Sequence, residues 1–551
     1  MKHPIALAVM TLSLLVAACT QPPESGRTEP KSVLPVGPLQ EAVYRFPLPS
    51  DPPTLDPMHV TDTVSDTVVR RVFNGLVRFS PQLEIVPDLA ENWLVSEDGL
   101  TYKFFLRRGV KFHHGRELSA QDFLYSLRRI LDARAAQAAG DVPSERAQML
   151  FPVKGAQAFF AGKASDLPGL EAPDEHTFII RLEHKYAPFL AVLCMSDFVA
   201  VPREVVEKDW KGFALHPVGT GPFVFDRWER ESEIVLKANR DYWESEVKLD
   251  VVVFKIIPDE NTRYQAFLTG DLEHTDIPFG KMAAISADPQ LSGRVHGVAA
   301  MDMYCYGFNC EREPFTNKLV RLAFNHAVDK ESIIRNILEG RGLLQKTYFP
   351  PGGFYFNEAS EGYPYDPEKA RAYLAKAGYP GGTGFPEVTL NIDQQQLSSQ
   401  VAAQVQEDLR QIGVKVRIEQ NDWATFLDRV YAGELSFHQN TWLADYPDPD
   451  NWLYVLLEST QAGAPGNITR FSHPQFDQLV RTARTTVDTA ERVRLYRKAE
   501  DIALASAPWL LLYWRKNLTL VQPYVRGLTI TAMDRTPHLN NTPLHEVFLE
   551  R

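Results

Sequence analysis

The segment from Trp442 to Trp452 places the carboxylate of Asp445 among aromatic residues just after an apolar stretch. That stretch, residues 435–442, is expected to be a buried strand, which the following prolines end abruptly. Asp445 therefore falls at the carboxyl end of a strand, where α/β proteins gather their ligand sites. A carboxylate between aromatic rings is suited to bind a cation. The alternative is a turn in which Asp445 or Asp448 accepts hydrogen bonds from its own backbone.

No catalytic constellation accompanies this segment. The sequence contains neither a G-x-S-x-G elbow nor an H-E-x-x-H motif. Residues 219–222 lack the lysine that closes a phosphate-binding loop, and they are expected to form a tight turn. His113 and His114 lack cysteines or carboxylates at metal-ligand spacing, so a turn explains them better than a metal site. We expect a protein that is not an enzyme and has no metal and no cofactor.

Composition narrows the class of protein further. A chain of 551 residues with 44% hydrophobic and 11% aromatic content can bury more than one core, so several domains are expected. The formal net charge of −12 argues against nucleic acid as a partner. Apart from Cys19, the chain has Cys194, Cys305 and Cys310, which allow at most one disulfide among them. The sequence does not decide whether any of them pair.

The N-terminal residues are typical of a bacterial lipoprotein signal peptide. An apolar run over 5–16 is too short to span a bilayer and ends in small residues before Cys19. Cleavage after residue 18 would leave Cys19 to carry lipid and anchor the chain to a membrane surface. Residues 19–40 are rich in Pro, Glu, Ser and Gly and are expected to be a flexible tether. The rest of the chain is expected to be soluble and extracytoplasmic, in the periplasm or at the cell surface.

Strand and helix patterns divide the remainder into two α/β regions. In the C-terminal half, strands are expected at 387–392, 414–420 and 509–514, with helices at 396–412, 422–432, 474–485 and 488–505. This alternation is typical of parallel strands with right-handed crossovers. The N-terminal half mixes strands near 102–106, 177–182, 233–237 and 250–257 with helices at 120–131 and 261–268. This mixture is typical of a second α/β region that carries an inserted module. Two regions between which the chain passes more than once form a hinge and can open and close on a ligand. The ligand site is therefore expected between them.

A series of short motifs runs through the chain from Glu41 to the C-terminus. It includes PPTLDP at 52–57, VFNGLV at 72–77, PDLAENW at 87–93, LRRGVKFHHG at 106–115, VGTGPF at 218–223 and NRDYW at 239–243. In content and order the series resembles the oligopeptide- and dipeptide-binding proteins that serve ABC importers, a family 5 type of extracellular solute-binding protein. The segment around Asp445 resembles the corresponding segment of that family.

The resemblance implies an α/β fold of two lobes, the periplasmic-binding-protein or Venus-flytrap fold, with a small extra domain inserted in the N-terminal lobe. Lobe I would comprise 41–73, 203–300 and, after a return crossing, 524–551. The inserted domain would comprise 74–202, and lobe II would comprise 301–523.

The resemblance also implies how a ligand would bind. An extended peptide would lie in the cleft and pair its backbone with the protein as an added strand does. Asp445 matches the aspartate that binds the peptide's ammonium group, and such a buried charge needs a partner. Thr61, Asp62 and Thr63 stand where the family presents backbone groups to the peptide, although a surface turn would explain them equally. Trp442 and Tyr446 flank Asp445 and are candidate walls of a side-chain pocket.

The partner of the ligand's carboxylate stays open at this point. Some oligopeptide binders carry an arginine six residues before the aspartate, where this chain has Gln439. Arg470, Lys346 and Arg429 are possible replacements, and each is also explained as a solvated surface charge.

The leading hypothesis is a lipid-anchored, monomeric receptor that captures short peptides and delivers them to an ABC permease with its ATPase subunits. Its contact with the membrane would be through the lipid alone. One alternative keeps the fold but binds another solute, such as a nickel chelate, haem or an oligosaccharide. Another is an extracytoplasmic chaperone or signalling lipoprotein.

Overall fold

The computed structural model describes residues 41–550 except 354 and 464–465. The expected signal peptide at 1–18, Cys19 and the tether at 19–40 lie outside these described residues. Within the described residues, no helix combines the length and the apolar character that a membrane crossing requires. Cys194, Cys305 and Cys310 are free thiols.

The first sheet of lobe I has four strands in the order β1 (Val43–Leu48), β10 (Val251–Ile256), β9 (Glu233–Ala238) and β8 (Phe223–Glu229). β1 runs parallel to β10, whereas the other neighbours are antiparallel. Helix α1 (Thr63–Val72) shares the hydrophobic core of this sheet through Val64, Val68 and Val72. The core therefore fixes α1, whose N-terminal end borders the site described below.

A separate antiparallel sheet lies within the range expected for the inserted domain. Its strand order is β4 (Ala90–Val95), β5 (Thr101–Leu106), β7 (Thr177–Arg181) and β6 (Leu170–Asp174). Helix α2 (Ala120–Leu131) packs on it, and the ring of Phe123 stacks on that of Phe178 with centroids 5.9 Å apart. The helix has the bounds that its sequence pattern predicts.

The largest sheet has seven strands, six of which follow one another in space. These are β11 (His274–Asp276), β17 (Trp509–Val521), β12 (Val295–Phe308), β16 (Phe437–Leu443), β14 (Val388–Ile392) and β15 (Val416–Gln420), while β13 (Gly342–Leu344) pairs with β17. β14 is parallel to β15 and β16, as the alternating pattern predicts. β12 runs antiparallel to both β16 and β17, which local periodicity did not indicate.

Four helices of the C-terminal half lie at nearly the positions that the sequence predicts. They are α13 (Gln396–Gln411), α14 (Trp423–Tyr431), α16 (Pro474–Thr485) and α17 (Thr489–Ser506).

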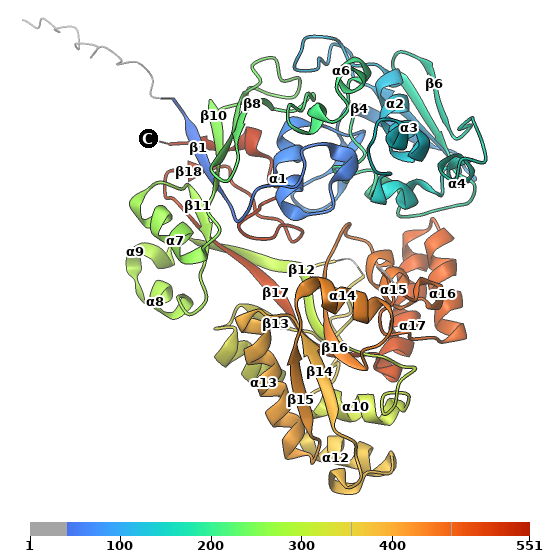
Figure 1. Ribbon diagram of the computed structural model, residues 1–551, viewed down its shortest axis with the longest axis vertical. Coiled ribbons are helices and arrows are strands. Elements are labelled where there is room, and N and C mark those ends of the chain that lie inside the picture. The colour runs from blue at the N-terminus through green and yellow to red at the C-terminus, as the bar shows by residue number, and fades with distance from the viewer. Residues whose placement is uncertain (1–40, 354, 464–465, 551) are drawn as a thin grey trace, which may run out of the picture. The chain divides into compact units, whose positions relative to one another are not determined.

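Two long neighbouring strands, β12 and β17, connect lobe II with the part of the chain that holds β11 (Figure 1). They pair along Val295–Ala299 and again along Met303–Gly307, with an irregularity between the two stretches. The expected boundary between residues 300 and 301 falls in that irregular part of β12. A break in the ladder between two paired stretches is where such a connection can bend.

A buried ion pair joins the first segment of lobe I to α2. The guanidinium of Arg129 donates to both carboxylate oxygens of Asp56, with Nη1 to Oδ1 at 2.8 Å, and both side chains are 2% exposed. The same carboxylate accepts from the backbone N–H of Met58. Because both charges are out of water, each depends on the other.

We expect Arg129→Ala to lower the free energy of unfolding by about 3 to 5 kcal/mol, because it leaves the Asp56 carboxylate buried without a cation. Urea unfolding followed by circular dichroism measures this change. The control is Arg203→Ala, which removes an exposed ion pair with Glu207 and should cost less than about 1 kcal/mol. Equal losses in the two variants would contradict the structural role of the buried pair.

Candidate functional site

The loop after β16 holds Asp445 in place through hydrogen bonds to one side chain. The backbone N–H of Asp445 donates to Oδ1 of Asn451 at 3.2 Å, and Nδ2 of Asn451 donates to Oδ2 of Asp445 at 3.3 Å. The N–H of Ala444 donates to the carbonyl of Met301 on β12, so the start of the loop is tied to the sheet. These bonds orient the carboxylate without supplying a charge of opposite sign.

The three aspartates of this segment have different surroundings. Asp448 is paired with Arg492 at 2.8 and 3.0 Å, and its Oδ1 accepts from the N–H of Asp450. Asp450 is fully buried against Arg484, with Nε to Oδ1 at 3.1 Å. The turn with its own backbone that the sequence suggests is therefore made by Asp448. The carboxylate of Asp445 stays 23% exposed and faces a cavity.

The opposite wall of this cavity is the start of α1. Oδ1 of Asp62 accepts from the N–H groups of Val64 and Ser65, both at 2.9 Å, so Asp62 caps the helix. At the other end of α1, Gly219 and Gly221 lie so close to the backbone of Val72 that an added Cβ would come within 2.0 and 2.6 Å of it. The glycines of the expected turn therefore let lobe I hold α1 closely.

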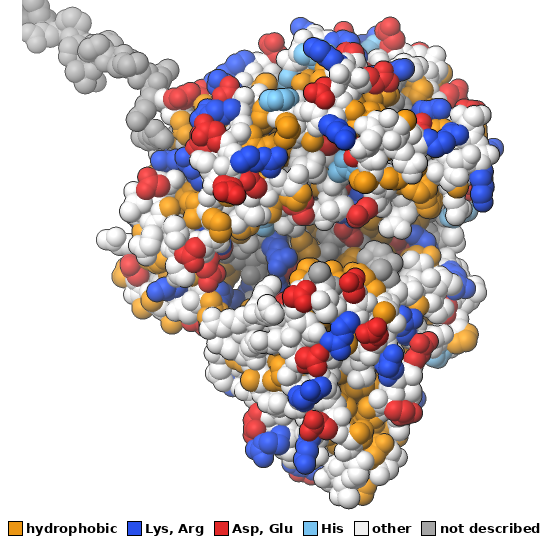
Figure 2. Space-filling model, in the orientation of Figure 1, with side chains coloured by type: hydrophobic (Ala, Val, Ile, Leu, Met, Phe, Trp, Pro, Cys, Tyr) orange, Lys and Arg blue, Asp and Glu red, His pale blue; other side chains and the backbone are white. Residues whose placement is uncertain are grey.

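One cavity of about 380 Å³ brings most of the predicted residues together. Its lining includes Asp445 from lobe II and Thr61, Asp62 and Thr63 from lobe I. The volume lies in the lower part of the range typical of small-molecule sites. Figure 2 shows the surface hollowed near the middle of the view, with charged side chains of both signs around the hollow.

Two carboxylates share one guanidinium inside this cavity. Arg146 lies 3.6 Å from Oδ1 of Asp445 through Nη1, and 3.5 Å from Oδ1 of Asp197 through Nε. Asp197 is almost fully buried, and its Oδ1 has no hydrogen-bond partner among the described residues. Burial raises the pKa of Asp197 to about 7. Asp445, which is partly exposed to the cavity, is therefore the carboxylate of this pair that is suited to bind a further cation.

Trp442 and Tyr446 do not line the cavity that Asp445 lines. The indole N–H of Trp442 donates to Oδ1 of Asn451 at 2.7 Å, and its ring borders a smaller cavity of about 180 Å³. Tyr446 is 2% exposed, and its hydroxyl donates to Oδ2 of Asp450 at 2.8 Å. Trp442 is therefore linked to Asp445 through Asn451, while Tyr446 is part of the packed interior.

The cations that sequence reasoning considered for a ligand carboxylate lie elsewhere. Arg470 donates to the carbonyl of Tyr431, Arg429 is paired with Glu419, and Lys346 is exposed. The described residues that line the cavity instead include Arg70, Arg146 and Arg535. These arginines, like Asp197, lie far from the Asp445 segment in the chain, and no local pattern marked them.

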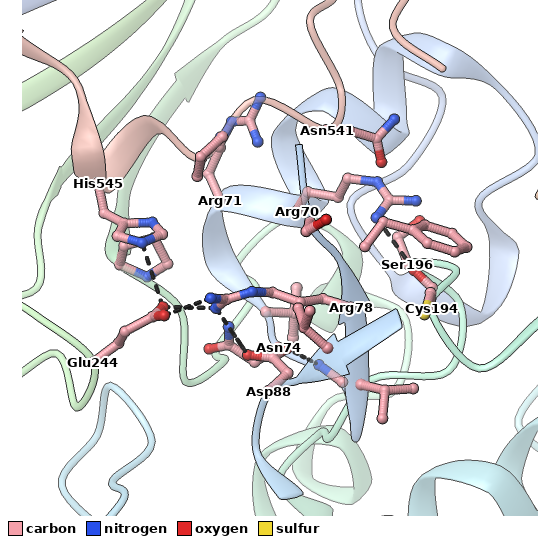
Figure 3. A pocket seen from close by; sticks show the side chains of 18 of the residues that line it. Arg70, Arg71, Asn74, Arg78, Asp88, Cys194, Ser196, Glu244, Asn541 and His545 are labelled. Atoms are coloured by element: carbon pink, nitrogen blue, oxygen red, sulfur yellow. Dashed lines mark hydrogen bonds and ion pairs between the residues drawn. The ribbon is translucent and has the colours of Figure 1, made fainter. Parts of the chain in front are cut away.

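A second cavity, of about 500 Å³, lies next to the first and shares Arg70, Met195, Ser196, Asn540 and Asn541 with it. Figure 3 shows Arg78 between Glu244 and Asp88, with His545 beside Glu244. Although Glu244 is partly buried, His545 and Arg78 hold its pKa well below the usual range, whereas burial raises the pKa of Asp88 to about 6. This larger cavity already pairs its own charges, which makes it a weaker candidate for a charged ligand.

A family model described as bacterial extracellular solute-binding proteins, family 5 middle, matches residues 84–464. The chain belongs to this family. It is 32% identical over 550 residues to heme-binding protein A of Haemophilus influenzae, covering 96% of each chain. It is 33% identical over 477 residues to di/tripeptide-binding protein 1 of Pseudomonas aeruginosa, covering 83% of this chain and 86% of that one.

Among solved structures, the ABC transporter-associated periplasmic binding protein DppA of Helicobacter pylori in complex with the peptide STSA superimposes with a TM-score of 0.75. The two chains are 30% identical, and the match covers 92% of this chain and 98% of the other. The expected two-lobed periplasmic-binding-protein fold is thus confirmed. Members of family 5 are named as binding proteins, so at this level the chain is a binding protein and its place is extracytoplasmic.

We expect Asp197→Asn to stabilise the protein more at pH 8 than at pH 5. The folded-state pKa of about 7 lies above the ordinary value of an aspartate. Between those two values the folded chain therefore holds more protons than the unfolded chain, and its stability falls as the pH rises. Asparagine has no such titration, so the stability of the variant relative to the native chain should rise by about 2 to 4 kcal/mol across that range.

Urea unfolding at several pH values measures this difference, with Asp501→Asn on the exposed face of α17 as the control. A relative stability that instead falls with rising pH would mean that Arg146 stabilises the ionised carboxylate more than burial disfavours it.

Proposed function

We propose that the protein is the extracytoplasmic receptor of an ABC importer and captures short peptides in the cavity between its lobes. The observation that carries this proposal is the pair of facing walls. Asp445 presents a carboxylate from lobe II, and Thr61, Asp62 and Thr63 line the same cavity from lobe I at the start of α1. Their backbone groups would pair with the peptide. Relatives named for di- and tripeptides, and a solved relative that holds the peptide STSA, support the choice of ligand.

The ammonium group of the peptide would bind at Asp445. An ammonium that leaves water requires an opposite charge, and the carboxylate of Asp445 faces the cavity with its nearest cation, Arg146, at 3.6 Å. The peptide backbone would pair with the walls, which gives affinity with little dependence on side chains. Trp442 remains a candidate wall for a side chain because it lines its own small cavity, whereas Tyr446, the other candidate, would need to move out of the packed interior to serve as one.

The filled receptor would deliver its peptide to a membrane permease driven by ATPase subunits. Lipid on Cys19 would keep the monomeric receptor at the membrane, and the tether at 19–40 would let it reach the permease. No chemistry is required of the receptor itself.

Haem is the second candidate ligand, because heme-binding protein A is similar along nearly the whole chain. Haem iron needs an axial ligand such as His, Cys, Tyr or Met. Of these types, the described residues that line the Asp445 cavity supply only Met195 and Met533. A haem absorption spectrum that changes on titration, and loses that change when both methionines are replaced by leucine, would favour haem over peptides.

We expect Asp445→Asn to weaken binding of peptides with a free amino group on the order of a hundredfold or more, because it removes the charge partner of the ammonium group. Calorimetry measures the affinity. N-acetylated peptides should bind weakly to the native protein, and the substitution should change their affinity little. The control is Asp501→Asn, whose side chain is exposed on α17. Unchanged affinity of Asp445→Asn for free-amine peptides would refute the ammonium assignment.

A further inference from the structure

Arg146 is held at one end by the segment that precedes α1. It lies in the short 3-10 helix η2 (Glu145–Leu150). The hydroxyl of Ser144 accepts from the backbone N–H of Arg146 at 3.2 Å and donates to the carbonyl of Met58 at 2.6 Å. Nε of Arg146 donates to the carbonyl of Val60, also at 3.2 Å. The backbone of Arg146 and the inner part of its guanidinium group are therefore fixed.

The outer nitrogens of the same guanidinium group are held loosely. Nη1 lies 3.6 Å from Oδ1 of Asp445, which is longer than a hydrogen bond. Within the described residues, neither Nη1 nor Nη2 of Arg146 makes a hydrogen bond, although both carry N–H donors. The side chain is 21% exposed, so a ligand in the cavity can reach it. The contact with Asp445 can therefore be exchanged without the loss of a hydrogen bond.

Asp197 offers this guanidinium group a second carboxyl. Its Oδ1 lies 3.5 Å from Nε of Arg146 and has no hydrogen-bond partner among the described residues. Asp66 and Arg70 of α1 also face Asp197, but they are paired with each other at 2.9 Å. Burial raises the pKa of Asp197 to about 7, so at neutral pH its carboxyl carries a proton about half of the time. The position of Arg146 therefore determines how readily Asp197 ionises.

The guanidinium group of Arg146 and the ammonium group of a peptide compete for the exposed side of Asp445. Both are cations, and two like charges about 4 Å apart repel each other where water is partly excluded. An ammonium group that arrives at Asp445 therefore favours movement of the guanidinium group toward Asp197, which it already contacts. A cation that approaches a buried carboxyl stabilises the ionised form of that carboxyl.

We propose that Arg146 competes with the ammonium group of the ligand for Asp445 and, when displaced, pairs with Asp197, whose carboxyl then releases its proton to solvent. This inference rests on the proposed peptide function and concerns the regulation of the same site. Before binding, Arg146 neutralises Asp445 while Asp197 is largely protonated. After binding, the ammonium group neutralises Asp445 and Arg146 neutralises Asp197. The enclosed cavity thus holds no unpaired charge in either state.

This exchange links binding to pH with a definite sign. Asp197 holds its proton less tightly after binding than before, so the affinity for a peptide rises with pH up to about 7, the pKa of Asp197 before binding. At higher pH this gain ends. The amino group of the peptide then loses its own proton, with a pKa near 8, and the affinity falls.

The test measures proton release and affinity together. Native mass spectrometry of the full chain with an equimolar library of di- and tripeptides identifies the member that binds most tightly, and calorimetry uses that peptide. Titrations at pH 6.5 in phosphate and in Bis-Tris, which differ in ionisation enthalpy, give the number of protons released. The native protein should release roughly half a proton or more per peptide, because the peptide's amino group is already charged at this pH and Asp197 is mostly protonated. Its affinity should rise roughly tenfold between pH 5.5 and pH 7.

Two variants separate the two steps. Asp197→Asn should bind without releasing protons, and its affinity should stay near that of the native protein at pH 5.5 across the whole range. Arg146→Gln should also release no protons. Its affinity at pH 5.5 should be roughly tenfold above native, because Asp445 has lost its internal competitor, and the difference should narrow toward pH 7. The control is Arg181→Gln, whose arginine is paired with Glu171 at the surface and which should behave as the native protein does.

Three results would each overturn the competition by Arg146 and leave the peptide function standing. These are binding to the native protein without proton release, unchanged release in Asp197→Asn, and an affinity of Arg146→Gln at pH 5.5 no higher than native. The first two do not depend on how well the Arg146 variant folds. If no member of the library binds to the native protein, the proposed function and this inference are both overturned.

Discussion

A charge that leaves water for an enclosed cavity must meet a charge of opposite sign, and the site of this protein follows from that constraint. Asp448 and Asp450 satisfy it internally, with Arg492 and Arg484, and so they stabilise the loop after β16. Asp445 lies 3.6 Å from its nearest cation, Arg146, and faces the cavity, so it is the carboxylate that we propose binds the ligand. In our proposal, the same loop contains both the structural and the ligand-binding members of its acidic cluster.

The fold determines which charges meet in the cavity. The large sheet ends β16 beside Met301, which places Asp445 at one wall, and the core of the first sheet holds α1 at the other. β12 and β17 pass between these regions, and the irregular pairing between Ala299 and Met303 interrupts their ladder. Groups from distant parts of the chain can therefore approach or separate around a ligand without disturbing either core.

Part of this site could be predicted from the sequence, because it depends on local pattern. Asp445 follows an apolar strand and precedes prolines, and the motif order placed Thr61, Asp62 and Thr63 in the opposite lobe. Arg146, Asp197 and Arg535 could not be found in this way, since they lie on short helical turns and loops whose contacts are with distant segments.

The helix bounds were predicted closely because they too depend on local pattern. The antiparallel course of β12 and β17 depends instead on pairing across more than two hundred residues. Tyr446 is buried with its hydroxyl bonded to Asp450, a contact that alternation along a strand does not reveal.

The most direct measurement is native mass spectrometry of the protein purified without denaturation, followed by identification of whatever it releases. The account predicts a mixture of short peptides with free amino termini, which should be absent from Asp445→Asn purified in the same way. Release of a single non-peptide compound by both proteins, or a cavity that stays empty when peptides are added, would contradict it.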